Sequence, residues 1–134
     1  MLTRIGFFRE FFADHPELPS IRDHVRPHPA ESAGQVVAYL RAGHVMSAVM
    51  EGMTDVIDGR SFEEGSGCSS LLTDGTWLWR RDLAHYVEAH NVELPAAFLR
   101  QAARGEVPPL SADELAELET IERRDYGPDW WVGP

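Results

Sequence analysis

The stretch Leu71-Leu72-Thr73-Asp74-Gly75-Thr76-Trp77-Leu78-Trp79-Arg80-Arg81 decides the fold, because it predicts two short strands, a tight turn and the approach to a helix. Asp-Gly between strand-forming residues is a strong hairpin signal, since a two-residue type I′ loop needs positive φ at both central positions. With this dipeptide as the loop, Thr73 pairs with Thr76, Leu72 with Trp77, Leu71 with Leu78 and Ser70 with Trp79. The hairpin is therefore the expected centre of the sheet.

The predicted register gives the hairpin two hydrophobic faces. Leu72, Trp77 and Trp79 share one face, and Leu71 and Leu78 share the other, because side chains alternate along a strand. Two layers must cover such a hairpin, or one face must meet a ligand. The helices predicted elsewhere have enough apolar stripes to cover both faces, so burial of the tryptophans is favoured over a ligand-binding face.

The rest of the chain predicts helices around this sheet. The predicted helices are residues 4–14 with Thr3 as cap, 30–42, 83–90 between Asp82 and Asn91, one beginning at Pro95, and one beginning with a Ser111–Glu114 capping box. The four phenylalanines of the first segment give it a broad apolar face that predicts a helix docked on the core. Residues 44–50 and 53–57 read as strands, and the aromatic segment 126–131 as docked. These elements predict a single α+β domain over 1–134, with a small, mainly antiparallel sheet of about four strands packed by about five helices.

The charge of the chain restricts its partners. The sequence has 22 acidic and 12 basic residues, a formal net charge of −10. Phosphate backbones and anionic lipids repel such a protein, so we expect neither nucleic-acid nor membrane binding. A more basic protein or a cationic ligand would be attracted. The simpler interpretation, that the charge keeps the protein in solution, is favoured.

Other features limit the class of protein further. Cys68 is the single cysteine, which excludes an internal disulfide and a multi-cysteine metal site. Arg4, Arg9 and Glu10 interrupt the apolar residues near the N-terminus, so no signal-peptide core is predicted, and no stretch is long enough to span a membrane. We therefore expect a cytoplasmic protein. The sequence does not predict an oligomeric state.

Candidate binding residues follow the edge of the hairpin and enter the next helix. They are Asp74, Trp77, Trp79, Arg80, Arg81 and His85. A guanidinium beside an indole can recognise carboxylates or aromatic ligands. The same arginines can instead pair with glutamates at the protein surface, and this structural interpretation is favoured.

Catalytic and metal-binding alternatives are weaker. Asp55, Asp58 and Asp74 lie near predicted strand ends, where two of them could act as general acid and base or bind a hard cation. Asp58 and Asp74 each precede a glycine, and the turn that an Asp-Gly dipeptide forms already explains these two residues. A Cys68 nucleophile with His85 or His44 as its base is a further alternative. His24 and His28 have the spacing of a metal-binding pair on a helix, but Pro27 and Pro29 disfavour a regular helix there. The sequence therefore predicts no catalytic residue, no metal site and no cofactor.

Three segments together carry a resemblance. They are Tyr39-Leu40-Arg41-Ala42-Gly43, then Leu72-Thr73-Asp74-Gly75-Thr76-Trp77-Leu78-Trp79, then Leu83-Ala84-His85-Tyr86-Val87 with Leu94-Pro95. Over roughly residues 20 to 100, the chain resembles a group of small bacterial proteins with a Tyr-Leu-x-x-Gly element and a Thr-Asp-Gly-x-Trp-x-Trp hairpin. Some of these resemble immunity proteins that neutralise secreted toxins. Many members have proline where this chain has Arg80, and the resemblance brings no active site with it.

Two functional hypotheses follow. The leading one is a non-enzymatic protein-interaction protein, of immunity type, whose acidic surface binds a more basic protein. It rests on the net charge, on the absence of catalytic motifs and on the resemblance. The alternative is a small-molecule-binding protein or hydrolase with a pocket on the Trp77/Trp79 face.

Overall fold

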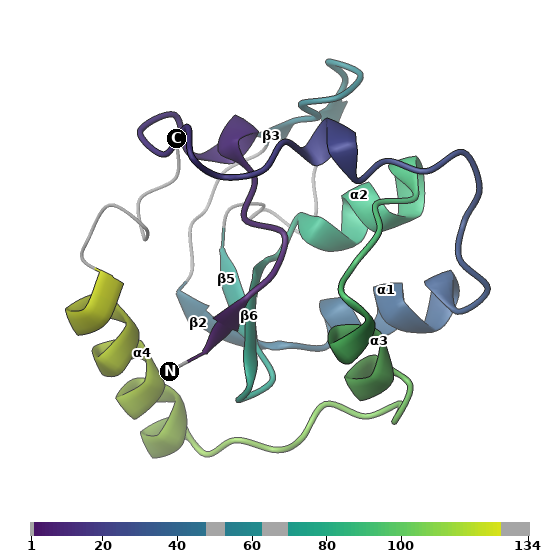
Figure 1. The fold of residues 1–134 in the computed structure, drawn as a ribbon. Helices are drawn as coiled ribbons and strands as arrows, with labels where there is room; N and C mark the ends of the chain where they lie inside the picture. The colour runs from purple at the N-terminus through teal and green to yellow at the C-terminus, as the bar shows by residue number, and fades with distance from the viewer. Residues whose placement is uncertain (1, 48–52, 63–69, 127–134) are drawn as a thin grey trace.

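The centre of the fold is a four-stranded sheet in the order β1-β6-β5-β2, in a computed structural model that describes residues 2–47, 53–62 and 70–126 (Figure 1). The strands are β1 (Thr3–Arg4), β2 (His44–Ser47), β5 (Leu71–Thr73) and β6 (Trp77–Arg80). β6 pairs antiparallel with β5, and β5 with β2, whereas β1 runs parallel to β6. The predicted α+β class and the mainly antiparallel sheet are confirmed, with one parallel edge strand that the sequence did not predict.

Helices and a second small sheet complete the described chain. The helices are α1 (Ala33–Arg41), α2 (Leu83–His90), α3 (Ala96–Ala102) and α4 (Ala112–Tyr126), with 3₁₀ turns η1 (Arg9–Phe11) and η2 (Ile21–Asp23); β3 (Met53–Thr54) pairs with β4 (Ser61–Phe62). The predicted bounds of α2 are confirmed, and Asn91 ends it with φ 55° and ψ 40°. The Ser111–Glu114 capping box is also confirmed. Asp82 is the N-cap residue of α2, as predicted, but its carboxylate pairs with Arg80 and makes no capping hydrogen bond.

The predicted register of the hairpin is wrong by two residues. Leu72 pairs with Trp79 and Thr73 with Leu78, so the loop is longer than the Asp74-Gly75 dipeptide. The Asp74 carboxylate accepts from the backbone N–H groups of Thr76 and Trp77 and closes this wider loop, in which Gly75 has φ +96°. Because a shift of two residues keeps every side chain on its face, the predicted sorting of the hairpin into two hydrophobic faces survives.

The N-terminal segment does not form the predicted helix over 4–14. Its start pairs with the hairpin instead, where the Thr3 N–H donates to the Thr76 carbonyl and the Ile5 N–H to the Leu78 carbonyl. Gly6 then has φ +70°, a left-handed conformation that interrupts any regular helix. The predicted docking of the phenylalanines is confirmed, because all four are buried: Phe7, Phe8, Phe11 and Phe12.

Two layers cover the hairpin. Phe98 of α3 lies 5.6 Å from the Trp79 ring, centroid to centroid, and covers the tryptophan face. On the opposite face the Arg80 guanidinium lies 4.2 Å from the centroid of Phe11. Trp79 is 0% exposed, so the face that could have held a ligand is part of the core.

Some predictions fall outside the described residues. They concern the end of the strand predicted over 44–50, Cys68 and the aromatic tail beyond Tyr126. Within the described part of the chain, no helix has the length and apolar character needed to cross a membrane.

Candidate functional site

Asp74 was predicted as a binding residue, and the structure places it inside the protein. Its carboxylate is 2% exposed, and one oxygen accepts from the N–H groups of Thr76 and Trp77 at 2.9 and 2.7 Å. The other oxygen accepts from the Tyr39 hydroxyl at 2.6 Å. Burial, together with this carboxylate, raises the pKa of Tyr39 to about 12. Asp74 therefore joins the hairpin loop to α1.

The two motifs that carry the resemblance contact each other. The Trp79 Nε1–H donates to the Leu40 carbonyl at 3.1 Å, and a Cβ atom at Gly43 would lie 2.6 Å from the Trp79 ring. Any side chain at this position would clash with the indole, so the last position of the Tyr-Leu-x-x-Gly element needs glycine. With the Tyr39–Asp74 hydrogen bond, these contacts make the two motifs one structural unit.

The other predicted binding residues are buried or half-buried in the fold. Arg80 is 1% exposed and makes two hydrogen bonds to the carboxylate of Asp82, which is 0% exposed. Its partner is therefore a buried aspartate and not a surface glutamate. Trp77 and Arg81 are half-buried. Of the six predicted residues, His85 alone contacts the polar cluster described next.

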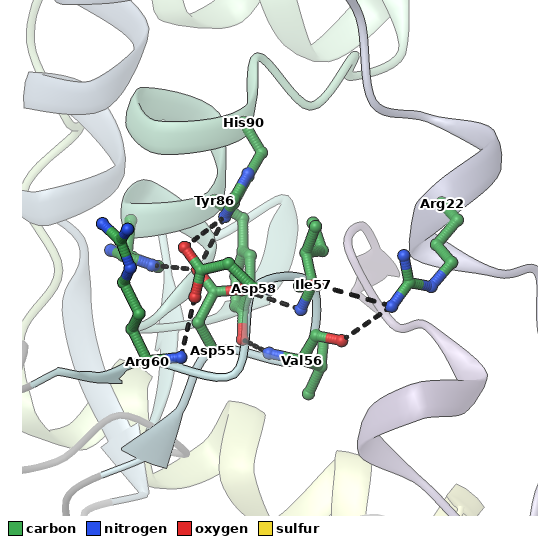
Figure 2. Close-up of polar contacts among 9 residues, drawn as sticks. Arg22, Asp55, Val56, Ile57, Asp58, Arg60, Tyr86 and His90 are labelled. Carbon is green, nitrogen blue, oxygen red and sulfur yellow. Dashed lines mark hydrogen bonds and ion pairs between the residues drawn. The ribbon is translucent and has the colours of Figure 1, made fainter.

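The second polar cluster centres on Asp55, in the turn between β3 and β4 (Figure 2). One carboxylate oxygen accepts from the N–H groups of Ile57 and Asp58, at 2.7 and 3.1 Å. The other oxygen lies 2.7 Å from Nε2 of His85 and 2.7 Å from Nε2 of His90. The carboxylate is 2% exposed, whereas the two imidazoles are partly open to solvent.

The surroundings hold the Asp55 turn against α2. The Val56 N–H donates to the Tyr86 hydroxyl at 3.0 Å, so the same helix supplies a third contact to the turn. Burial disfavours the charged carboxylate, but the hydrogen bonds from His85, Asp58, Ile57 and His90 outweigh it and lower the pKa of Asp55 to about 2. Asp55 is therefore a preorganised anion facing two imidazoles.

Sequence patterns pointed to Asp55 and His85 separately and gave no signal for His90. Five helical residues turn a side chain by about 140°, which is not the spacing of a metal-binding pair on one helix face. The two imidazoles meet because Asp55, thirty residues away, lies between their ends. No local sequence signal could have brought these three residues together.

A different kind of surface lies on α4. This helix packs beside β2, away from α1, α2 and α3 (Figure 1). Glu122 is its buried anchor, because the carboxylate accepts from the Leu2 N–H at 2.8 Å and from Arg4 at 3.2 Å. Asp113, Glu114 and Glu117 are exposed. We call these three residues the acidic face of α4.

A cavity of about 480 Å³ lies between α1, α2 and the start of α3. Apolar side chains line most of it, and the exposed Arg26–Glu93 ion pair lies at its margin. Neither Trp77 nor Trp79 lines this cavity, so it is not the pocket that the alternative hypothesis required.

No protein-family model, curated protein or solved structure matches the chain.

Proposed function

We propose that this protein is a non-enzymatic interaction protein, of immunity type, that binds a more basic protein through the acidic face of α4. The observation that carries the proposal is the setting of Asp113, Glu114 and Glu117 on a helix that exposes most of its described side chains. α2, in contrast, buries four of its eight residues: Leu83, Ala84, Tyr86 and Val87. α4 therefore presents far more of its surface to a partner.

Partly exposed apolar groups on α4 and on β2, which it contacts, support the same proposal. Leu115 and Leu118 are only partly buried. On the neighbouring β2, Val45 is 39% exposed. Among the described residues it is the one large hydrophobic side chain that is exposed to solvent. Protein interfaces combine a small apolar centre with a polar rim, and charge complementarity accelerates their formation.

The alternative hypothesis has less support. A small-molecule pocket on the Trp77/Trp79 face would need the indoles to be accessible, and Trp79 lies under α1 and α3. Asp74 and Arg80, the charged groups expected beside such a pocket, are held by Tyr39 and Asp82.

The test uses the full chain as bait in a lysate of its native cells, at low and moderate salt. An Asp113→Asn/Glu117→Gln variant should capture less of a basic partner, because two exposed carboxylates are removed from the acidic face. An Asp14→Asn/Glu31→Gln variant is the matched control, since it removes the same charge from other exposed positions. A basic partner that is lost with salt and with the α4 variant, but kept by the control, supports the proposal. Failure to capture any partner, or equal capture by the two variants, contradicts it.

A further inference from the structure

The chemistry of the Asp55 cluster goes beyond a role in protein interaction. Asp55, His85 and His90 each place one possible ligand atom within 4.8 Å of the other two. Asp55 Oδ2 lies 2.7 Å from Nε2 of each histidine. They come from two elements, the β3–β4 turn and α2, which contact each other here (Figure 2). From this geometry we propose that the three side chains form a binding site for a divalent transition-metal ion.

The donor set selects the class of metal. Two imidazole nitrogens and one carboxylate oxygen suit Zn²⁺ and the neighbouring first-row metals, whereas Mg²⁺ and Ca²⁺ prefer oxygen ligands throughout. Asp58 is available as a further ligand, because its carboxylate lies 3.6 Å from His90 Nε2 and is partly exposed. With Asp58 or a water molecule as the fourth ligand, the site has the coordination number that Zn²⁺ commonly adopts.

The distances leave room for a metal ion after a small movement. Donor atoms around a tetrahedral ion with bonds of about 2.0–2.2 Å are separated by about 3.3–3.5 Å. The two N–O separations here are 2.7 Å, the length of a hydrogen bond. An opening of less than about 1 Å is needed, and both imidazoles are partly exposed, so solvent can accommodate the change.

The turn orients Asp55 before any metal binds. Ile57 and Asp58 hold one carboxylate oxygen through their N–H groups, so the other oxygen is directed at the histidines. Such outer contacts fix the orientation of a metal ligand and increase affinity. On binding, each Nε2 supplies its lone pair to the ion, and the ring then carries its proton on Nδ1. No covalent or redox step is involved.

The experiment titrates the metal-free full chain with Co²⁺ and records its visible absorption, then adds Zn²⁺ in competition. We expect one ion per chain, absorption typical of low coordination, and displacement by Zn²⁺ but not by Mg²⁺. His90→Gln should weaken binding more than about tenfold, because the loss of an outer-shell partner alone costs that much. His28→Gln is the matched control, since His28 is an exposed histidine outside the cluster and should leave binding unchanged.

Folding of each variant is checked by circular dichroism without metal. Asp55→Asn should also weaken Co²⁺ binding, because it replaces the carboxylate ligand. If that variant fails to fold, His90→Gln still tests the site, because the His90 side chain is partly exposed and its loss leaves the turn contacts of Asp55 intact. Absence of Co²⁺ and Zn²⁺ binding by the wild-type chain, or equal affinity in His90→Gln and His28→Gln, would show that the cluster is only a hydrogen-bonded structural contact and would overturn the proposal.

Discussion

Asp74 and Asp55 accept the same kind of backbone hydrogen bonds but differ in their side-chain partners. Each is 2% exposed, and each uses one carboxylate oxygen to accept from two backbone N–H groups of its own turn. The second oxygen of Asp74 meets the Tyr39 hydroxyl, whereas that of Asp55 meets two imidazoles. The same local turn chemistry thus supports a purely structural contact in one place and a candidate metal site in the other.

The difference arises from the side chains that other elements bring. Tyr39 is 3% exposed, and its pKa is raised to about 12, so near neutral pH its hydroxyl stays protonated. It donates to Asp74, accepts from the Gln101 amide and has no lone pair to offer a metal ion in place of these contacts. Imidazoles can donate a hydrogen bond or supply a lone pair to a metal ion. An aspartate in an Asx-type turn is therefore not a functional signal until its second oxygen has been located.

The largest expected effect comes from Asp74→Ala. The change removes the acceptor of the Thr76 and Trp77 N–H groups and leaves the buried Tyr39 hydroxyl without its carboxylate partner. We expect the free energy of unfolding to fall by about 3 kcal/mol, because an unsatisfied buried polar group and two lost backbone hydrogen bonds contribute together. Urea unfolding followed by Trp fluorescence measures it, and a loss below about 1 kcal/mol would contradict the structural role given to Asp74.

A smaller effect is expected from Tyr39→Phe, and it should depend on pH. Loss of the hydrogen bond to Asp74 should lower the free energy of unfolding by about 2 kcal/mol at neutral pH, since a hydrogen bond to a charged group is among the stronger ones. The pKa of Tyr39 is raised from 10.0 in the reference state to about 12 in the folded protein. The protonated phenol therefore contributes its stability fully below pH 10, and this contribution is lost as the pH rises toward 12.

Measurement of unfolding by urea at several pH values tests this prediction. The wild-type chain and Tyr39→Phe should differ most below pH 10 and converge as the pH approaches 12. If the difference in the free energy of unfolding stayed constant over this pH range, the pKa of Tyr39 would not be raised in the folded protein, and the prediction would be wrong.

Asp55→Ala should have the smallest effect of the three when no metal is present. Its turn is more exposed than the hairpin loop, and water can replace part of its hydrogen bonding to Ile57, Asp58 and the two histidines. We expect a loss of about 1 kcal/mol in the free energy of unfolding, measured in the presence of a chelator. A loss as large as that of Asp74→Ala would place both aspartates in the same structural class and remove the contrast between them.

The sequence alone determined the parts of this protein that depend on local chemistry. The hairpin at Asp74-Gly75, the bounds of α2, the left-handed Asn91 and the Ser111–Glu114 capping box follow from turn and cap preferences within a few residues. The alternation of side chains also gave the correct faces of the hairpin, since that property is unchanged by a shift of two residues.

Only the tertiary structure decided what depends on distant partners. The four phenylalanines near the N-terminus suggested a helix, but pairing of Thr3 and Ile5 with β6 produced a strand and a left-handed Gly6. Burial of Arg80 required packing against Phe11, and the approach of His85 and His90 required Asp55. Such contacts join residues far apart in the chain, and their free energy depends on burial and direction, which no local pattern of residues encodes.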